Sequence, residues 1–166
     1  KSGKEENFDF QILNATENVN KAQKVILVSE IEKYFGGNIK DKKIAMWGLA
    51  FKANTDDIRE ASSLDNISLL LEKGAKITAY DAIAEENVKK IFGDKIEYTK
   101  DMYSCLEDAD CLLIATEWSE FKNPNFQLMA EKMKNKAIFD GRNMFSIDQI
   151  ENTGFYYKSI GRKTIK

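Results

Sequence analysis

Short apolar runs alternate with helical stretches along most of this chain. The strand candidates are rich in β-branched and aromatic residues and lie at 43–48, 76–81, 95–99, 111–116, 136–141 and 155–161. Helical patterns fill the intervals, at 62–74, 84–93, 101–107, 124–133 and 146–152. Strands that alternate with helices form a parallel sheet with helices on both faces. The sequence therefore predicts an α/β fold with a doubly wound, mostly parallel, six-stranded Rossmann-like sheet.

A long uninterrupted stretch precedes the first strand. Residues 8–35 contain no glycine or proline, and their apolar residues recur at steps of three and four. These residues are Phe8, Ile12, Ala15, Val19, Ala22, Val25, Ile26, Val28, Ile31 and Phe35. The spacing predicts one long amphipathic N-terminal helix that ends at Gly36-Gly37. Its apolar face must be covered, either by the sheet of this chain or by a neighbouring domain. We interpret residues 1–37 as a connector and residues 38–166 as the Rossmann-like domain.

Composition excludes several classes of function. The net charge of −2 provides no basic field for nucleic acid. We expect no membrane span, because no apolar run approaches the roughly 18–20 residues that one needs. The chain has no histidine, which excludes Ser-His-Asp and Cys-His catalysis within it. Cys105 and Cys111 give neither a disulfide framework nor a zinc-ligand spacing, so we expect buried free thiols in the cytoplasm and no metal site.

The loop that follows the first strand is the first candidate site, because ligands of open α/β sheets bind beyond the carboxyl ends of the strands. After Gly48 it has neither the glycines of a dinucleotide fingerprint nor a P-loop pattern. Asp81 ends the second strand, where dinucleotide-binding domains place an acidic residue that holds the ribose. It lies 33 residues after Gly48, however, against about 20 expected. Lys52 and Arg59 could neutralise phosphate charge, or the loop could simply be a solvated charged segment.

Two more segments end at the same edge of the predicted sheet. Arg142 follows the strand at 136–141 and can reach toward the same crevice as Lys52. Trp118 and Phe121 follow the strand at 111–116, and we interpret them as a cover for the end of the sheet.

Four segments carry a family resemblance. In order along the chain they are GLAFKANTDDIREASS, ATEWSEF, IFDGRN and GFYYKSIGR. Together they resemble the C-terminal domain of the UDP-glucose/GDP-mannose dehydrogenase family over residues 40–162. The N-terminal helix is similar to the end of that family's central dimerisation helix. The Thr-Glu-Trp and Asp-Gly-Arg-Asn segments resemble the UDP-glucose branch more than the GDP-mannose or UDP-N-acetylmannosamine branches.

The resemblance implies roles for four residues. Phe51 and Lys52 match a pair that contacts the nucleotide sugar, with the lysine near its phosphates. Arg142 matches a second substrate-binding position. Arg59 matches an arginine that reaches across a domain interface to NAD, which the N-terminal domain of the family binds.

The resemblance also implies an activity in which this chain is one part. Family members oxidise UDP-glucose twice with NAD, giving UDP-glucuronate, through a cysteine nucleophile in a segment that this chain lacks. The implied partners are a UDP-sugar, the N-terminal and central domains of the same enzyme, and a second copy in a homodimer. No catalytic residue is expected here, so the isolated chain should be inactive. The alternatives are a relative that acts on UDP-N-acetylmannosamine or GDP-mannose, and a free-standing nucleotide-binding module.

Overall fold

The computed structural model describes residues 11–166. Its strands are β1 (Lys43–Trp47), β2 (Lys76–Tyr80), β3 (Glu97–Tyr98), β4 (Cys111–Ile114), β5 (Ala137–Asp140) and β6 (Tyr156–Ser159). Its α-helices are α2 (Gln11–Lys24), α3 (Ile26–Tyr34), α4 (Ser62–Glu72), α5 (Glu85–Phe92), α6 (Phe126–Lys132) and α7 (Ile147–Ile150). Short 3₁₀ turns are η1 (Gly93–Lys95), η2 (Ser104–Leu106) and η3 (Ser119–Phe121). Every predicted strand is present, whereas the helix predicted at 101–107 is only the turn η2.

The strands form one parallel sheet in the order β3-β2-β1-β4-β5-β6. This order confirms the predicted doubly wound Rossmann-like sheet. The direction of winding reverses between β1 and β4, which lie side by side at the centre. A crevice for ligands is expected at that switch point, outside the carboxyl ends of these two strands.

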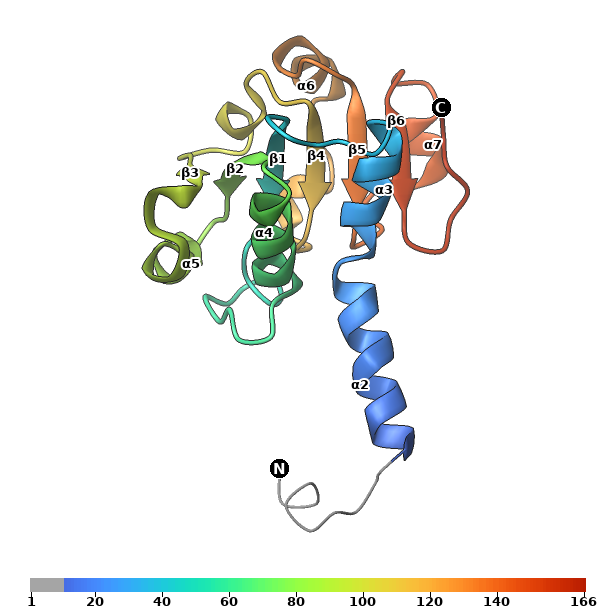
Figure 1. The fold of residues 1–166 in the computed structure, drawn as a ribbon. Helices are drawn as coiled ribbons and strands as arrows, with labels where there is room; N and C mark the ends of the chain where they lie inside the picture. Colours follow the sequence, from blue (N-terminus) through green and yellow to red (C-terminus); the bar gives the residue numbers. More distant parts are fainter. Residues whose placement is uncertain (1–10) are drawn as a thin grey trace.

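The central strands are buried on both faces. All of β4 and β5 and all but the first residue of β1 are buried, as expected for a parallel sheet that is covered on both sides. Helices α3 and α4 lie next to each other on one face, against β5 and β2 respectively (Figure 1). The buried strands form a tightly packed central layer, which fixes the positions of their carboxyl ends.

The N-terminal stretch differs from the prediction of one continuous helix. It forms two helices that meet at Val25, and residues 8–10 of the predicted helix lie outside the described residues. At the break the Val28 amide donates to the Val25 carbonyl at 3.0 Å, while the Lys24 carbonyl accepts from Asn66 Nδ2 at 2.9 Å. A side chain on α4 therefore satisfies a carbonyl at the end of α2, a role that spacing alone could not reveal.

The two halves of this stretch also differ in burial. In α3, Leu27, Val28 and Ile31 are buried in the core of the domain. In α2 no residue is buried, and Ile12 and Val19 are 83% and 58% exposed. Helix α2 extends away from the sheet, beyond the carboxyl ends of its strands (Figure 1). Across residues 11–166, every helix is too short or too polar to cross a membrane.

Candidate functional site

The end of β1 is held close to the end of β4. Gly48 has φ 88°, and a Cβ atom at this position would overlap the side chain of Thr116. Only glycine permits both the left-handed backbone and the close approach. The Thr116 hydroxyl then donates to the Ala50 carbonyl at 2.6 Å. These contacts fix the start of the 48–61 loop, which joins β1 to α4.

Asp81 anchors the same loop from the end of β2. Its side chain is buried and accepts five hydrogen bonds at 2.6–3.0 Å, from the amides of Leu49, Ala50, Ile83 and Ala84 and from the indole of Trp118. Both carboxylate oxygens therefore serve the chain's own loops and leave no acceptor for a ribose. The unusual spacing from Gly48 agrees with this structural role, as does the interpretation of Trp118 as a cover.

Arg142 joins the ends of three strands. Its Nε donates to the Ala115 carbonyl at 2.7 Å, and its Nη2 donates to the Phe51 carbonyl at 3.1 Å. Glu117 Oε2 lies 3.3 Å from Nε. The guanidinium is thus held in a fixed direction between the loops that follow β1 and β4.

Asp140, the last residue of β5, holds the turn that carries Arg142. Its carboxylate accepts from the amides of Arg142 and Met144 at 2.8 and 2.6 Å, and from the Tyr157 hydroxyl at 2.8 Å. A tyrosine hydroxyl is protonated at neutral pH and can donate, and burial raises the pKa of Tyr157 further. The turn that carries Arg142 is therefore fixed by a buried network.

Two of the predicted site residues, Phe51 and Arg142, line one cavity of about 680 Å³ between α2 and the carboxyl edge of the sheet. We call it the edge cavity. It is lined by Glu17, Asn20, Lys21, Gln23, Lys24, Ile26, Leu27, Phe51, Glu60, Ser62, Asn66, Leu113, Ile114, Ala115, Gly141, Arg142 and Ile160. The sheet contributes apolar surface, and α2 contributes polar and charged side chains. Lys52 is exposed next to Phe51 in the sequence but is not among these residues.

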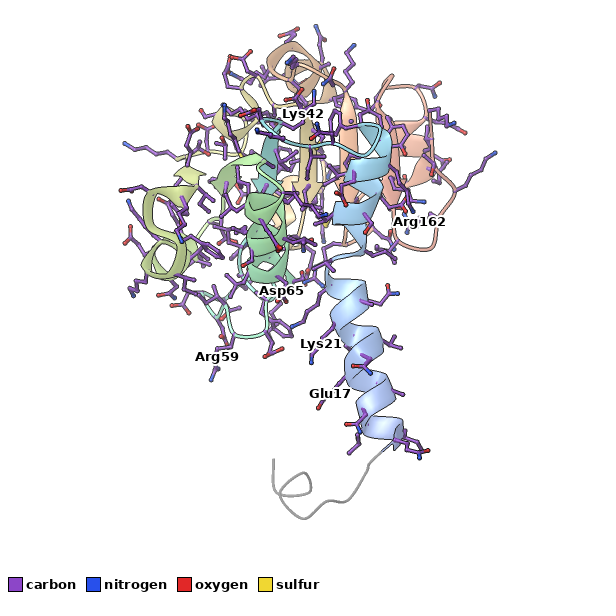
Figure 2. All side chains as sticks on the ribbon, in the orientation of Figure 1. Glu17, Lys21, Lys42, Arg59, Asp65 and Arg162 are labelled. Atoms are coloured by element: carbon purple, nitrogen blue, oxygen red, sulfur yellow. The ribbon has the colours of Figure 1, made fainter. Side chains whose placement is uncertain are left out.

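Arg59 lies apart from the edge cavity, in a shallow hollow between the 48–61 loop and α5. It points away from the domain at the outer end of the loop (Figure 2). Its side chain is 87% exposed and forks onto Asp57, with Nε–Oδ1 at 2.9 Å and Nη2–Oδ2 at 2.7 Å. This contact lowers the pKa of Asp57 to about 2. The structure thus separates Arg59 from Phe51 and Arg142.

Sequence reasoning missed the polar wall that α2 contributes. Lys21 and Lys24 lie on α2 and both line the edge cavity, and Figure 2 shows Lys21 on the part of α2 below the sheet. Their spacing of three residues predicts one shared helix face. It does not predict which way that face turns, because the orientation of α2 depends on the break at Val25.

The remaining candidates have structural roles. Cys105 and Cys111 are free and fully buried, as predicted, and burial raises the pKa of the Cys105 thiol to about 12. Neither is a nucleophile at neutral pH. Phe121 is buried and stacks on Trp47. Within residues 11–166, His, Cys, Asp and Glu side chains form no group of three that could hold a metal ion.

Known proteins resemble this chain over most of its length. Residues 45–147 match the UDP binding domain of the UDP-glucose/GDP-mannose dehydrogenase family. UDP-glucose 6-dehydrogenase TuaD of Bacillus subtilis is 37% identical over 96% of this chain, and UDP-glucose 6-dehydrogenase of Pseudomonas aeruginosa is 35% identical over 98%. The match covers only 34% and 37% of those two proteins, so the chain spans about a third of their length.

Solved structures show the same relationship. The UDP-glucose dehydrogenase of Pyrobaculum islandicum superposes with a TM-score of 0.78 and 27% identity, over 94% of this chain and 33% of that one. The UDP-D-ManNAc dehydrogenase of Pyrococcus horikoshii superposes with a TM-score of 0.73 and 25% identity, over 94% of this chain and 35% of that one.

Proposed function

The chain belongs to the UDP-glucose/GDP-mannose dehydrogenase family, and we propose that it is the substrate-binding part of an NAD-dependent UDP-glucose 6-dehydrogenase. In this proposal the edge cavity receives the nucleotide sugar. Phe51 and Arg142 contact it from the cavity wall, and Lys52 reaches its phosphates from the rim. The whole enzyme would oxidise UDP-glucose to UDP-glucuronate.

The bridge between Arg142 and the Phe51 carbonyl is the observation that carries this proposal. It brings residues 91 positions apart in the sequence to one cavity wall. A guanidinium is a strong partner for a diphosphate, because its charge is permanent and its donors lie in a plane. Since the carbonyls of Ala115 and Phe51 already fix the direction of the guanidinium, phosphate binding would require little reordering of this side chain.

This sheet edge does not fit a dinucleotide. The loop after β1 lacks the required glycines, and both oxygens of Asp81 are occupied by the chain's own donors. We therefore place NAD on a part of the full protein outside this chain, and assign Arg59 to reach it. The large exposure of Arg59 supports this role, since the side chain could exchange Asp57 for a phosphate without breaking any buried contact.

The proposed enzyme uses this chain to bind and orient the nucleotide sugar. Its two cysteines supply no thiol nucleophile, because both are buried. We propose that residues 1–37 connect the domain at 38–166 to the rest of the enzyme. The exposed apolar residues of α2 would then be covered by that part and by the partner in a homodimer. Two free thiols suit the cytoplasm as the compartment.

Kinetics of the full-length protein test this function. The protein should reduce NAD with UDP-glucose, while the 166-residue chain should produce no NADH above background. UDP-N-acetylmannosamine and GDP-mannose should be poorer substrates. A clear preference for either of them would move the assignment to another branch of the family. Tight UDP-glucose binding with no oxidation of any sugar nucleotide would favour a free-standing nucleotide-binding module.

A further inference from the structure

The junction between α2 and the sheet domain is held by contacts of four side chains, Lys24, Glu60, Asp65 and Asn66. Asn66, on α4, donates from Nδ2 to the Lys24 carbonyl at 2.9 Å and to the Ser62 carbonyl at 2.6 Å. Lys24 Nζ lies 2.8 Å from Glu60 Oε2 and 3.4 Å from Asp65 Oδ2. The bond to Ser62 lies within α4, whereas the other three contacts cross from α2 to the 48–61 loop or to α4.

These contacts sit at the point where α2 can change direction. Val25, between the two helices, has φ −113° and ψ 8°, outside the helical range. On the far side of this break α3 is buried in the core, whereas α2 buries none of its residues. The apolar packing that fixes α3 therefore does not fix α2. The contacts at the end of α2 therefore contribute to its angle.

The angle of α2 also sets the width of the edge cavity. Helix α2 provides one wall, with Asn20, Lys21 and Lys24, and the opposite wall carries Phe51 and Arg142. Glu60 belongs to the same loop as Phe51 and holds φ 59°, a left-handed conformation that is uncommon outside glycine. The junction thus links the helix wall directly to the loop that carries the proposed substrate contacts.

We infer that Asn66 and Lys24 are positioning residues that hold α2 at one angle to the sheet and so keep the edge cavity at the width that its ligand needs. The hydrogen bond from Asn66 is the stronger of the two contacts, because this residue is buried, with 4% of its surface exposed. The Lys24–Glu60 pair is weaker, since the Glu60 side chain is 84% exposed and solvent screens it. The kinetic part of this inference rests on the proposed function, whereas its structural part does not.

Distances between spin labels test the structural part in the 166-residue chain. Ile12→Cys on α2 and Ile91→Cys on α5 place labels at exposed positions, and the native thiols are too buried to compete. Ile12 lies about 18 Å along the helix from Lys24, so a bend of about 20° at Val25 moves it by about 6 Å. Asn66→Ala should broaden the distance distribution most and Lys24→Met less. Lys24→Arg should keep the wild-type width.

Matched controls separate a loss of positioning from general damage. Ser68→Ala removes an exposed side-chain hydrogen bond within α4, and Lys33→Met removes an ion pair within α3. Neither contact touches α2, so both variants should keep the wild-type width. Equal widths for Asn66→Ala, Lys24→Met and the two controls would overturn the inference. If Asn66→Ala fails to fold, Lys24→Met alone decides, because its contacts lie at the surface.

Kinetics of the full-length enzyme test the consequence. Asn66→Ala should raise KM for UDP-glucose about threefold to tenfold, the effect of losing the one Asn66 hydrogen bond that crosses to α2, while KM for NAD and kcat stay unchanged. A loss of kcat with KM unchanged would contradict a positioning role. An enzyme that oxidises no sugar nucleotide would refute the proposed function, and the label distances would still decide on the junction.

Discussion

Arg142 follows β5 with a side chain that is 31% exposed and directed by two carbonyl oxygens, whereas Arg59 lies in the 48–61 loop and is 87% exposed. Both follow strands of the same sheet at the same edge. The partners of Arg142 come from distant parts of the chain, while Arg59 pairs with Asp57 two residues away. Folding therefore fixes the direction of one charge and leaves the other at the surface, where another part of the protein can use it.

The largest effect is expected at Asp81. This carboxylate holds the start of the 48–61 loop, whose Phe51 carbonyl accepts a hydrogen bond from Arg142. Asp81→Ala would leave five donors without their acceptor, four of them backbone amides. Each buried donor without a partner costs about 1–3 kcal/mol, and the costs do not simply add, so we expect a loss of about 3 kcal/mol or more in the free energy of unfolding. Urea denaturation measures this loss.

Asp94→Ala is the matched control, because this aspartate is exposed just after α5. It should change the free energy of unfolding by less than about 0.5 kcal/mol. Similar values for the two variants would mean that Asp81 does not hold the loops of the carboxyl edge together.

A smaller effect is expected at Lys52, which is exposed and lies outside the edge cavity. Lys52→Ala should weaken UDP-glucose binding by the full-length protein about tenfold, since a charge-assisted contact is worth about 1.5–3 kcal/mol before solvent screening. The urea midpoint should not move. Calorimetric titration beside urea denaturation separates the two quantities. Unchanged UDP-glucose affinity would leave Lys52 as an ordinary surface charge.

The smallest effect concerns the local pair of Asp57 and Arg59. Arg59 lowers the pKa of Asp57 from 3.8 to about 2 in the folded chain. Because the folded pKa is the lower one, the pair stabilises the fold above about pH 4, and this contribution is lost as the pH falls toward 2. Wild type and Asp57→Asn should therefore differ slightly in thermal midpoint at pH 6 and converge in acid. A difference that is constant over this range would exclude the pair as its cause.

The sheet could be predicted from the sequence because its signal is local. Each strand is a short apolar run between helical patterns, and all of the strands predicted from such runs are present. The pairing of Phe51 with Arg142 could be predicted only as a shared edge, since parallel strands end together. The carbonyls that fix Arg142 depend on how two loops fold over each other, which leaves no mark in residue spacing.

The break at Val25 escaped prediction for a related reason. The apolar pattern runs through it without interruption, and the contact that satisfies the Lys24 carbonyl comes from Asn66, 42 residues later. The same applies to Lys21 and Lys24 in the edge cavity, because their direction follows from that break. Contacts between distant residues determine both features.

Separate titrations of the full-length protein with UDP-glucose and NAD test the contrast between the two arginines most directly. Arg142→Ala should weaken UDP-glucose binding about tenfold to a hundredfold and leave NAD binding nearly unchanged, as the loss of a charge-assisted phosphate contact requires. Arg59→Ala should weaken NAD binding and leave UDP-glucose binding nearly unchanged. Substitutions that both affect the same ligand, or that shift neither affinity beyond about twofold, would contradict the account.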